Sequence, residues 1–440
     1  MENHKSRSAT FFAAPDRPLL RDREGVVGLD LFLNRATSLA KRLPDRPAAI
    51  NLCERRDHFL LGFTALLLRQ QTCLLPPARN DVVVGEVSAE HPGSYVLDDA
   101  LVERACRCEP ARRLPAPAIP AERVVAIGYT SGSTGRPKAN PKTWGSFQAS
   151  TALNASRLQE VLASRYGQAA LPWIVATVPP QHMYGLETSI LLPLLAGMAI
   201  HAGQPLFPAD IAAALAECPG PRVLVSTPVH LRALLESGVP LPEVGAIVSA
   251  TAPLPASLAL QIEQRFGTVL LEYFGSTETC VIASRCTANE ADWKAYPGLS
   301  LEPDADGTLV NAPWFAATVL LQDVLELRPG NRFVVRGRSA DMVEVAGKRA
   351  SLADLTRRLM ALPGVTDAVI FQPEDEADTH ARRLAALVVA DGLTEAQLAA
   401  AFAARVDPVF VPRPLVLVKA LPRNEVGKLP RAQLLAALKR

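Results

Sequence analysis

Residues 129–138 read Tyr129-Thr-Ser-Gly-Ser-Thr-Gly-Arg-Pro-Lys138, and this stretch decides the fold class. From residue 130 to residue 136, every residue except the last is Gly, Ser or Thr. Small side chains leave backbone N–H groups accessible to an anion. Lys138 adds a positive point charge at the end of the stretch. The composition therefore predicts a loop that binds a polyphosphate.

The residues around this stretch support a loop after a strand. The apolar run 124–127 predicts a buried strand that ends where the small residues begin. The spacing differs from a Walker loop, which has four residues between its first Gly and a Gly-Lys pair. Here two residues separate Gly132 from Gly135, and Pro137 precedes the lysine. A Walker-type ATPase is disfavoured, while a flexible linker remains open for the stretch taken alone.

Downstream segments alternate between strand and helix patterns. The sequence predicts strands at 222–226, 246–249 and 269–273, and helices at 228–237 and 255–266. Short apolar strands separated by amphipathic helices indicate parallel βαβ units. Ligands of such sheets bind beyond the carboxyl ends of the strands. The residues that follow each strand are therefore the candidates for a site.

The C-terminal part has a different pattern. It predicts strands at 333–337, 365–371, 384–389 and 415–418, with helices at 353–361, 395–405 and 432–439. We expect an α/β protein with a large N-terminal domain of parallel-rich βαβ sheets, residues 1–337, and a small mobile α+β domain, residues 338–440. The hinge is expected at 337–341.

Bulk properties exclude several classes of protein. The formal net charge of +2 over 440 residues argues against a nucleic-acid-binding surface. The seven scattered cysteines indicate free thiols in a reducing compartment. The longest apolar stretch, 190–200, contains Pro193 and is too short for a membrane span. Residues 1–14 lack the apolar core of a signal peptide. We expect a cytoplasmic protein without an integral membrane segment.

Further motifs follow the first stretch in a fixed order. They are Pro179-Pro-Gln-His-Met-Tyr-Gly185, Ser249-Ala-Thr-Ala-Pro-Leu-Pro255, Glu272-Tyr-Phe-Gly-Ser-Thr-Glu-Thr279, Gly337-Arg338 with Val345-Ala-Gly-Lys348, and Pro422-Arg-Asn-Glu-Val-Gly-Lys428-Leu-Pro-Arg431. The ordered set resembles the adenylate-forming superfamily of acyl-CoA and aryl-CoA synthetases, adenylation domains and luciferases. The resemblance runs from about Val124 to the C-terminus. The strings at 178–186 and 347–352 look like those of acyl synthetases from aryl-polyene and xanthomonadin-type pigment pathways.

This resemblance implies an AMP-forming acid–thiol ligase that uses ATP and Mg²⁺. The expected substrate is a small aromatic acid, hydroxybenzoate-like or cinnamate-like, and the expected acceptor is the phosphopantetheine thiol of an acyl carrier protein. An aryl- or fatty-acyl-CoA ligase is the alternative within the class. A non-catalytic nucleotide-binding relative is the alternative outside it, motivated by Ala139 in place of the usual glycine and Ala340 in place of the usual hinge acid.

The resemblance also assigns nucleotide-binding residues. The resemblance implies that ATP phosphates are bound by Thr277 and by the loop residues Thr130, Ser131, Gly132, Ser133, Thr134, Gly135 and Lys138. Glu278 would bind Mg²⁺, which prefers oxygen ligands. Adenine would lie between Thr251–Ala252 and Tyr273–Phe274–Gly275, and the ribose beside Asp323 and Arg338. Other interpretations are a helix-start acid for Glu278 and a surface ion pair for Asp323 or Arg338. Leu321-Gln322 replaces the usual Thr-Gly before Asp323.

The catalytic residues implied by the resemblance are Lys428, Thr277 and His182. Lys428 would bridge the carboxylate oxygen and the α-phosphate in the transition state, although an isolated Gly-Lys turn equally fits a solvated lysine. His182 would line the acyl pocket with Tyr184, Gly185 and His230, and would gate the second half-reaction. A buried, hydrogen-bonded histidine without a ligand is the alternative for His182.

Overall fold

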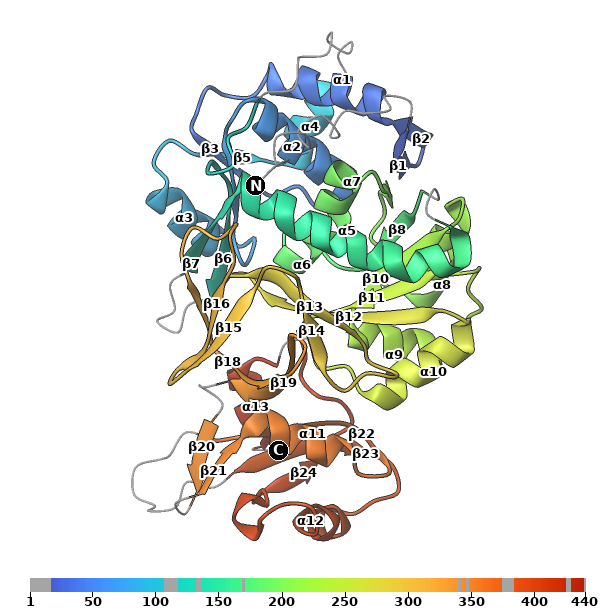
Figure 1. Cartoon of the computed structure of the whole chain (residues 1–440), viewed down its shortest axis with the longest axis vertical. Coiled ribbons are helices and arrows are strands. Elements are labelled where there is room, and N and C mark those ends of the chain that lie inside the picture. The colour runs from blue at the N-terminus through green and yellow to red at the C-terminus, as the bar shows by residue number, and fades with distance from the viewer. Residues whose placement is uncertain are drawn as a thin grey trace. The chain divides into compact units, whose positions relative to one another are not determined.

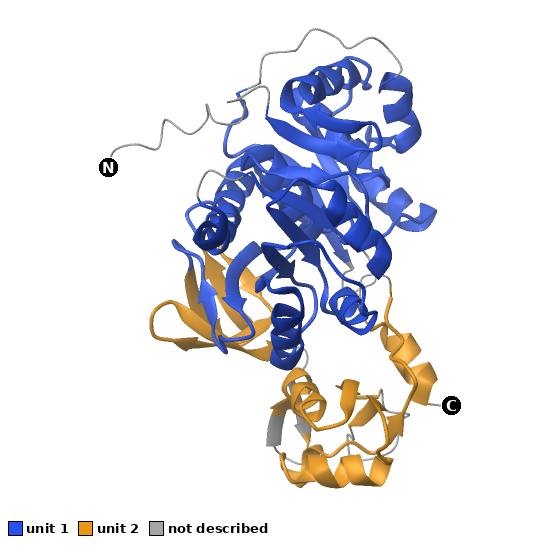
Figure 2. Cartoon of the chain, turned by 90° about the vertical axis from the view of Figure 1, so that its right-hand side faces the viewer, with its two compact units in different colours: residues 1–299, 312–317 blue, residues 300–311, 318–440 orange. Residues whose placement is uncertain are grey.

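The computed structural model describes residues 17–106, 118–131, 137–167, 171–338, 342–345, 348–373, 384–424 and 429–438. The chain forms two compact units (Figure 2). Unit 1 comprises residues 1–299 and 312–317, and unit 2 comprises residues 300–311 and 318–440. The expected small domain, residues 338–440, makes up most of unit 2. In the described part of the chain, no helix is long and apolar enough to cross a membrane.

The larger sheet of unit 1 contains the predicted βαβ units (Figure 1). Its strands follow the order β14 (Trp293–Ala295), β13 (Cys280–Cys286), β12 (Val269–Ser276), β11 (Ala246–Ser249), β10 (Arg222–Ser226), β8 (Trp173–Ala176), β9 (Ala199–His201), β1 (Pro18–Asp22) and β2 (Gly25–Gly28). The neighbours from β9 to β12 are all parallel. Their carboxyl ends therefore meet at one edge of the sheet, where a ligand site is expected.

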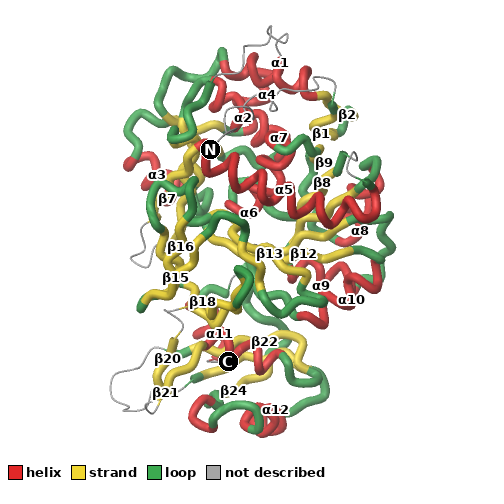
Figure 3. The backbone as a smooth tube through the Cα atoms, in the orientation of Figure 1, coloured by secondary structure: helices red, strands yellow, loops and turns green. Residues whose placement is uncertain are grey.

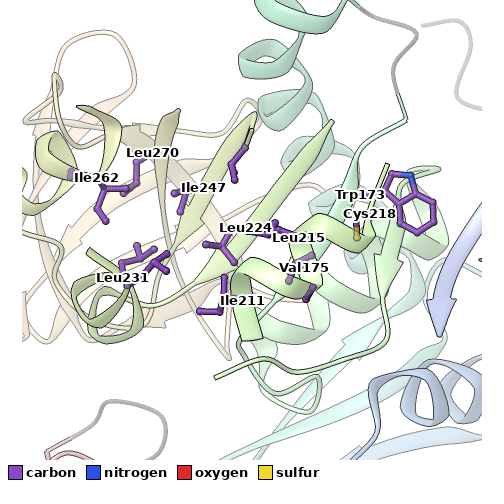
Figure 4. Close-up of a cluster of buried hydrophobic side chains, with 14 of the residues drawn as sticks. Trp173, Val175, Ile211, Leu215, Cys218, Leu224, Leu231, Ile247, Ile262 and Leu270 are labelled. Carbon is purple, nitrogen blue, oxygen red and sulfur yellow. The ribbon is translucent and has the colours of Figure 1, made fainter. Parts of the chain in front are cut away.

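One face of this sheet is covered by α8 (Pro208–Glu217), α9 (Pro228–Glu236) and α10 (Ala256–Phe266). Apolar side chains from these helices and from the strands form one buried cluster (Figure 4), which includes Val175, Leu224, Ile247, Leu270, Leu231 and Ile262. The predicted start of α9 and the predicted end of α10 are confirmed, whereas α8 was not predicted. Proline lies in the first turn of α8 and of α9, and Gly267 ends α10 at φ 58°.

The long helix α5 (Trp144–Tyr166) contacts β11 and β13 of the larger sheet. It also contacts the short helices that follow β8, namely the π-helix η2 (Glu187–Leu191) and α7 (Leu192–Leu195). The remaining short helix is α6 (Met183–Leu186), which directly precedes η2. A π-helical turn is rare and occurs frequently at functional sites.

The second sheet of unit 1 holds the strand that leads into the Gly/Ser/Thr stretch. Its order is β5 (Tyr95–Leu97), β3 (Ala48–Asn51), β4 (Thr72–Leu75), β6 (Val124–Ser131) and β7 (Pro137–Thr143). The helices α1 (Leu29–Ala40), α2 (Arg56–Leu68), α3 (Asp81–Glu90) and α4 (Asp99–Cys106) belong to the same part of the chain. Residues before 124 carry no motif, and three of their strands complete the sheet that supports β6.

Unit 2 contains four groups of strands (Figure 3). They are β15 (Ser300–Asp304), β16 (Gly307–Asn311) and β17 (Val319–Leu321); β18 (Asp323–Arg328) with β19 (Arg332–Arg338); β20 (Met342–Val345) with β21 (Lys348–Ser351); and β22 (Val365–Phe371), β23 (Ala385–Ala390) and β24 (Leu415–Leu417). The helices are α11 (Leu352–Met360), α12 (Glu395–Ala403) and α13 (Arg431–Leu438), with a 3₁₀ turn at Pro408–Phe410. Two buried clusters, one with Leu359 and Phe402 and one with Leu387, agree with the expected α+β unit.

Candidate active site

The strands on either side of the Gly/Ser/Thr stretch, β6 and β7, pair as an antiparallel hairpin. Thr130 pairs with Lys138 across the ladder, and Ser131 pairs with Pro137. The Asn140 side-chain amide donates to Thr130 Oγ1 at 3.4 Å and to the Lys138 carbonyl at 3.0 Å. Lys138 is exposed. The predicted loop residues Gly132, Ser133, Thr134 and Gly135 lie outside the described residues. The sequence predicted the strand before the stretch and missed the strand after it.

Three of the predicted motifs approach one another at Gly128, which lies in β6 two residues before Thr130. A β-carbon built on Gly128 would lie 3.1 Å from Met183 Cε and 3.1 Å from Thr277 Cγ2. Met183 directly follows His182, and Thr277 directly follows β12. The glycine thus allows the hairpin, the acyl-pocket motif and the Thr277–Glu278 motif to approach one another closely. Residues far apart in the sequence thus lie close together in the fold.

The turn from Ser276 to Cys280 is tight and strained. The Ser276 hydroxyl accepts the backbone N–H groups of Glu278 and Thr279, both at 3.2 Å. Gly275 lies so close to the returning chain that a β-carbon would be 2.1 Å from the Cys280 carbonyl oxygen. Cys280 itself has φ 61°, a conformation that costs free energy in a non-glycine residue. Such strain is frequent where a chain presents groups to a ligand.

Glu278 provides the carboxylate predicted to bind Mg²⁺. Among the described residues, no group of three or more His, Cys, Asp or Glu side chains could hold a metal ion. Mg²⁺ commonly uses one or two carboxylates and completes its shell with substrate phosphates and water. A single half-buried carboxylate beside a hairpin that is expected to bind phosphate fits that mode of binding.

The predicted adenine turn is also strained. Thr251 is exposed and has φ 78°, which is unusual for a β-branched residue. Glu272 holds the backbone near this turn, because its carboxylate accepts the Leu254 backbone N–H at 3.2 Å. Burial raises the pKa of Glu272, and the charge of Arg285, 2.7 Å away, opposes that shift. An ion pair between the buried Glu272 and the half-buried Arg285 thus supports the backbone of this turn.

The two aromatic residues predicted beside adenine point in different directions, because successive residues of a strand face opposite sides. Tyr273 is buried, and its hydroxyl donates to the Asn154 carbonyl at 3.3 Å. Phe274 is half-buried, and its ring lies 5.2 Å from the Trp293 ring. The Arg285 guanidinium lies 4.3 Å from the centre of the same indole. The face available for stacking is therefore that of Phe274.

The acyl-pocket motif begins a helix at the end of β8. His182 is half-buried at the N-cap position of α6. Gly185 packs on the preceding loop, where a β-carbon would lie 2.0 Å from the Pro179 carbonyl oxygen. Tyr184 is buried, and its hydroxyl reaches the backbone carbonyls of Ser226 at 3.2 Å and Val248 at 2.9 Å. Tyr184 therefore ties α6 to the ends of β10 and β11.

His230 belongs to a polar cluster at the carboxyl ends of β8 and β10. Its Nδ1 lies 2.9 Å from Thr177 Oγ1, which in turn lies 3.1 Å from Ser226 Oγ. Burial lowers the pKa of His230, so the neutral imidazole is favoured. Thr177 and Ser226 are fully buried, so the half-buried His230 is the member of the cluster that could meet a ligand, and it would do so without adding a charge.

The sequence interpretation missed two buried charged residues beside this motif. Arg56, at the start of α2, donates to the carbonyls of Ala176 at 2.9 Å and Val178 at 2.8 Å, and burial lowers its pKa to about 9. Glu187 accepts hydrogen bonds from Ser150 and Asn154 of α5. A lone carboxylate within the apolar run 186–195 was a signal for Glu187. Nothing in the local sequence distinguishes Arg56 from a surface arginine.

Unit 2 carries the other predicted residues. Asp323 and Arg338 are cross-strand partners in the hairpin β18–β19, so the two expected ribose-binding residues lie opposite each other in the backbone register. Lys428 and the expected hinge residues Ala340 and Asp341 lie outside the described residues.

Comparisons with known proteins agree on one class. A family model described as AMP-binding enzyme matches residues 66–313. A 4-coumarate–CoA ligase from Rhodobacter capsulatus is 31% identical over 70% of this chain and 75% of its own length. The indoleacetate–CoA ligase of Aromatoleum aromaticum is 24% identical over 77% of this chain and 71% of its own length. The structure of o-succinylbenzoate coenzyme A synthetase from Bacillus subtilis, in complex with AMP, has a TM-score of 0.79 at 20% identity, covering 96% of this chain and 95% of that one.

Proposed function

The chain belongs to the AMP-binding enzyme family, and on that premise we propose that it is an ATP- and Mg²⁺-dependent acid–thiol ligase for a small aromatic carboxylic acid. The observation that carries the proposal is the meeting of the β6–β7 hairpin, Met183 and Thr277 around Gly128. It supports the proposal because the hairpin expected to bind phosphate, the start of the expected acyl pocket and Thr277, which precedes Glu278, lie close together.

In the first half-reaction, a carboxylate oxygen attacks the α-phosphorus of ATP, and the bond to the bridging oxygen breaks to release pyrophosphate. Both reactants are anions, so catalysis depends on positioning and on neutralising charge. Lys138 and the hairpin N–H groups would hold the β- and γ-phosphates, and Thr277 would contact phosphate. Mg²⁺ on Glu278 would neutralise phosphate charge. Lys428 of unit 2 would stabilise the charge that develops between the two reactants.

In the second half-reaction, a thiol attacks the acyl carbonyl carbon, loses its proton, and displaces AMP. Two observations favour different acceptors. The relatives named 4-coumarate–CoA ligase and indoleacetate–CoA ligase favour coenzyme A. The motif strings at 178–186 and 347–352 resemble carrier-protein-loading synthetases and favour a phosphopantetheinyl carrier protein.

The acid side of the proposal rests on the polar cluster at the strand ends. The half-buried, neutral His230, whose Nδ1 is paired with the buried Thr177, suits an uncharged hydroxyl on an aromatic ring. A second carboxylate would find no compensating charge in that cluster. This favours hydroxybenzoate- and hydroxycinnamate-like acids over dicarboxylic acids.

Acid-dependent exchange of pyrophosphate into ATP tests the first half-reaction. A panel of benzoates, hydroxybenzoates, hydroxycinnamates, fatty acids and malonate is assayed, followed by single-turnover transfer to coenzyme A or to a holo carrier protein. We expect exchange with hydroxylated aromatic acids. Exchange only with fatty acids or malonate would contradict the aromatic assignment, and MgATP binding without exchange for any acid would favour a non-catalytic relative.

A further inference from the structure

Two buried charged side chains bind the backbone of the Ser276–Cys280 turn, which carries Thr277 and Glu278, and of the residue that follows it. Lys142 binds at Glu278, and Glu187 binds at Val281. The Lys142 ammonium donates to the Glu278 carbonyl oxygen. The two carboxylate oxygens of Glu187 accept the Val281 backbone N–H at 3.0 and 3.3 Å. Lys142 is 5% exposed and Glu187 is 1% exposed. Burying a charge is costly unless hydrogen bonds compensate it, so two such groups on one short turn indicate a specific role.

The first of these groups comes from the phosphate-binding hairpin. Lys138, Asn140 and Lys142 lie on the same face of β7, because alternate residues of a strand face the same way. Asn140 contacts Thr130 across the ladder, and Lys142 contacts the carbonyl of Glu278. One face of one strand therefore reaches both Thr130, at the start of the Gly/Ser/Thr stretch, and the candidate metal-binding turn.

The second group comes from the acyl-pocket motif. Glu187 begins η2 directly after α6, which carries Tyr184 and Gly185. The Ser150 hydroxyl and the Asn154 side-chain amide of α5 donate to the same carboxylate. Burial raises the pKa of Glu187, and these donors and the charge of Lys142 oppose the shift. With donors on several sides, the carboxylate is fixed in orientation and can hold the backbone of Val281 in place.

We propose that Lys142 and Glu187 are positioning residues that fix the Ser276–Cys280 turn, and Val281 directly after it, between the phosphate-binding hairpin and the acyl-pocket helix. Neither needs to touch a substrate. Each holds the backbone from which Thr277 and Glu278 reach the nucleotide and its metal ion. The inference deepens the proposed function and rests on it, because it assumes that this turn binds MgATP.

Shape-matched variants test the proposal. Lys142→Met and Glu187→Leu remove the contacts to the turn, while Glu187→Gln keeps an oxygen that can accept the Val281 N–H. MgATP affinity is measured by calorimetry, together with KM values for MgATP and for the acid. We expect Lys142→Met and Glu187→Leu to weaken MgATP affinity about tenfold or more, as expected for one lost hydrogen bond to a charged group, and Glu187→Gln to retain most of it.

A core variant separates positioning from general destabilisation. Leu234→Ala removes a buried side chain of α9 in the cluster on the helix-covered face of the sheet, so it should lower the melting temperature without changing MgATP affinity. The proposal is overturned if Lys142→Met and Glu187→Leu also keep MgATP affinity within about twofold of wild type while losing stability.

The double variant tests whether both residues act on the same turn. If they do, Lys142→Met with Glu187→Leu weakens affinity by less than the product of the two single effects, because the first change already releases the turn. Multiplicative effects would refute the shared role. If wild-type protein binds MgATP but exchanges no pyrophosphate, the proposed ligase activity is refuted. The positioning role of Lys142 and Glu187 is then still tested by the MgATP affinities of the variants. Wild-type protein without MgATP affinity refutes both.

Discussion

At the scale of single residues, Gly185 is required by packing. A β-carbon there would lie 2.0 Å from the Pro179 carbonyl oxygen, which is backbone and cannot move aside cheaply. We expect Gly185→Ala to destabilise the protein by at least about 2 kcal/mol in urea unfolding. Gly85 in α3 is the matched control, since no atom lies within 4 Å of its would-be β-carbon. Gly85→Ala should stabilise by about 0.5–1 kcal/mol. Equal effects at the two positions would contradict the packing argument.

His230 makes a prediction about pH. Burial lowers its pKa in the folded state, so the unfolded chain binds a proton more readily. The stabilisation is complete above the unfolded-state pKa of about 6.5 and is lost as pH falls below that value. His230→Gln should therefore show a shallower loss of unfolding free energy from about pH 6.5 to about pH 5. The difference in slope cannot exceed about 1.4 kcal/mol per pH unit. Urea unfolding across this range measures it, and identical slopes would refute the assignment.

The sequence could reveal a functional residue when its neighbours in the chain form a recognisable motif. It could not reveal a residue whose surroundings come from distant parts of the chain. Thr277, Glu278 and the hairpin residues stand in motifs, and Gly128, Met183 and Thr277 do meet in the structure. Lys142 lies in a polar segment that reads as solvated, and its burial arises from contact with residue 278, far away in the sequence. Arg56 is buried for a similar reason, by contacts with residues 176, 178 and 189. Such long-range contacts leave no trace in local composition.

At the scale of elements, the hairpin β12–β13 contains an ion pair between the buried Glu272 and the half-buried Arg285, and each partner depends on the other. Glu272 accepts from Arg285, from Thr287 at 2.6 Å and from the Leu254 backbone. Arg285→Met leaves a buried carboxylate without its counter-charge and should cost about 3 kcal/mol. Adding Glu272→Gln removes that charge and should recover at least half of the loss. Urea unfolding of the single and double variants measures this, and a double variant less stable than Arg285→Met would refute it.

Most elements were predictable because their signals are local. The strands at 222–226 and 246–249 and the helix limits at Pro228 and Gly267 agree with the structure. The strand β7 was missed because it contains Pro137 and Pro141 and has no apolar alternation. Prolines are tolerated there because β7 is an edge strand of its sheet. Pairing with β6, rather than the residue types of β7, determines this strand.

At the scale of the whole molecule, the proposed chemistry divides its residues between the two units. The hairpin β6–β7 and Thr277 belong to unit 1, while Lys428 belongs to unit 2. Lys428→Ala should therefore leave MgATP affinity within about threefold of wild type and lower acid-dependent pyrophosphate exchange by at least about a hundredfold. Calorimetry and exchange on the same preparation measure both. Exchange at the wild-type rate would remove Lys428 from the reaction, and loss of MgATP binding would give it a different role.

The alternation along β7 limits how this enzyme can evolve. Its three functional positions, Lys138, Asn140 and Lys142, are separated by the exposed residues Ala139 and Pro141. Losing or gaining one residue between them would turn part of this set toward solvent. An insertion or deletion inside the strand must therefore involve two residues, because a change of one residue would abolish activity. Substitutions at positions 139 and 141 can accumulate. Libraries of variants in this region should keep the number of residues between these positions. They should vary only positions 139 and 141, whose side chains are exposed.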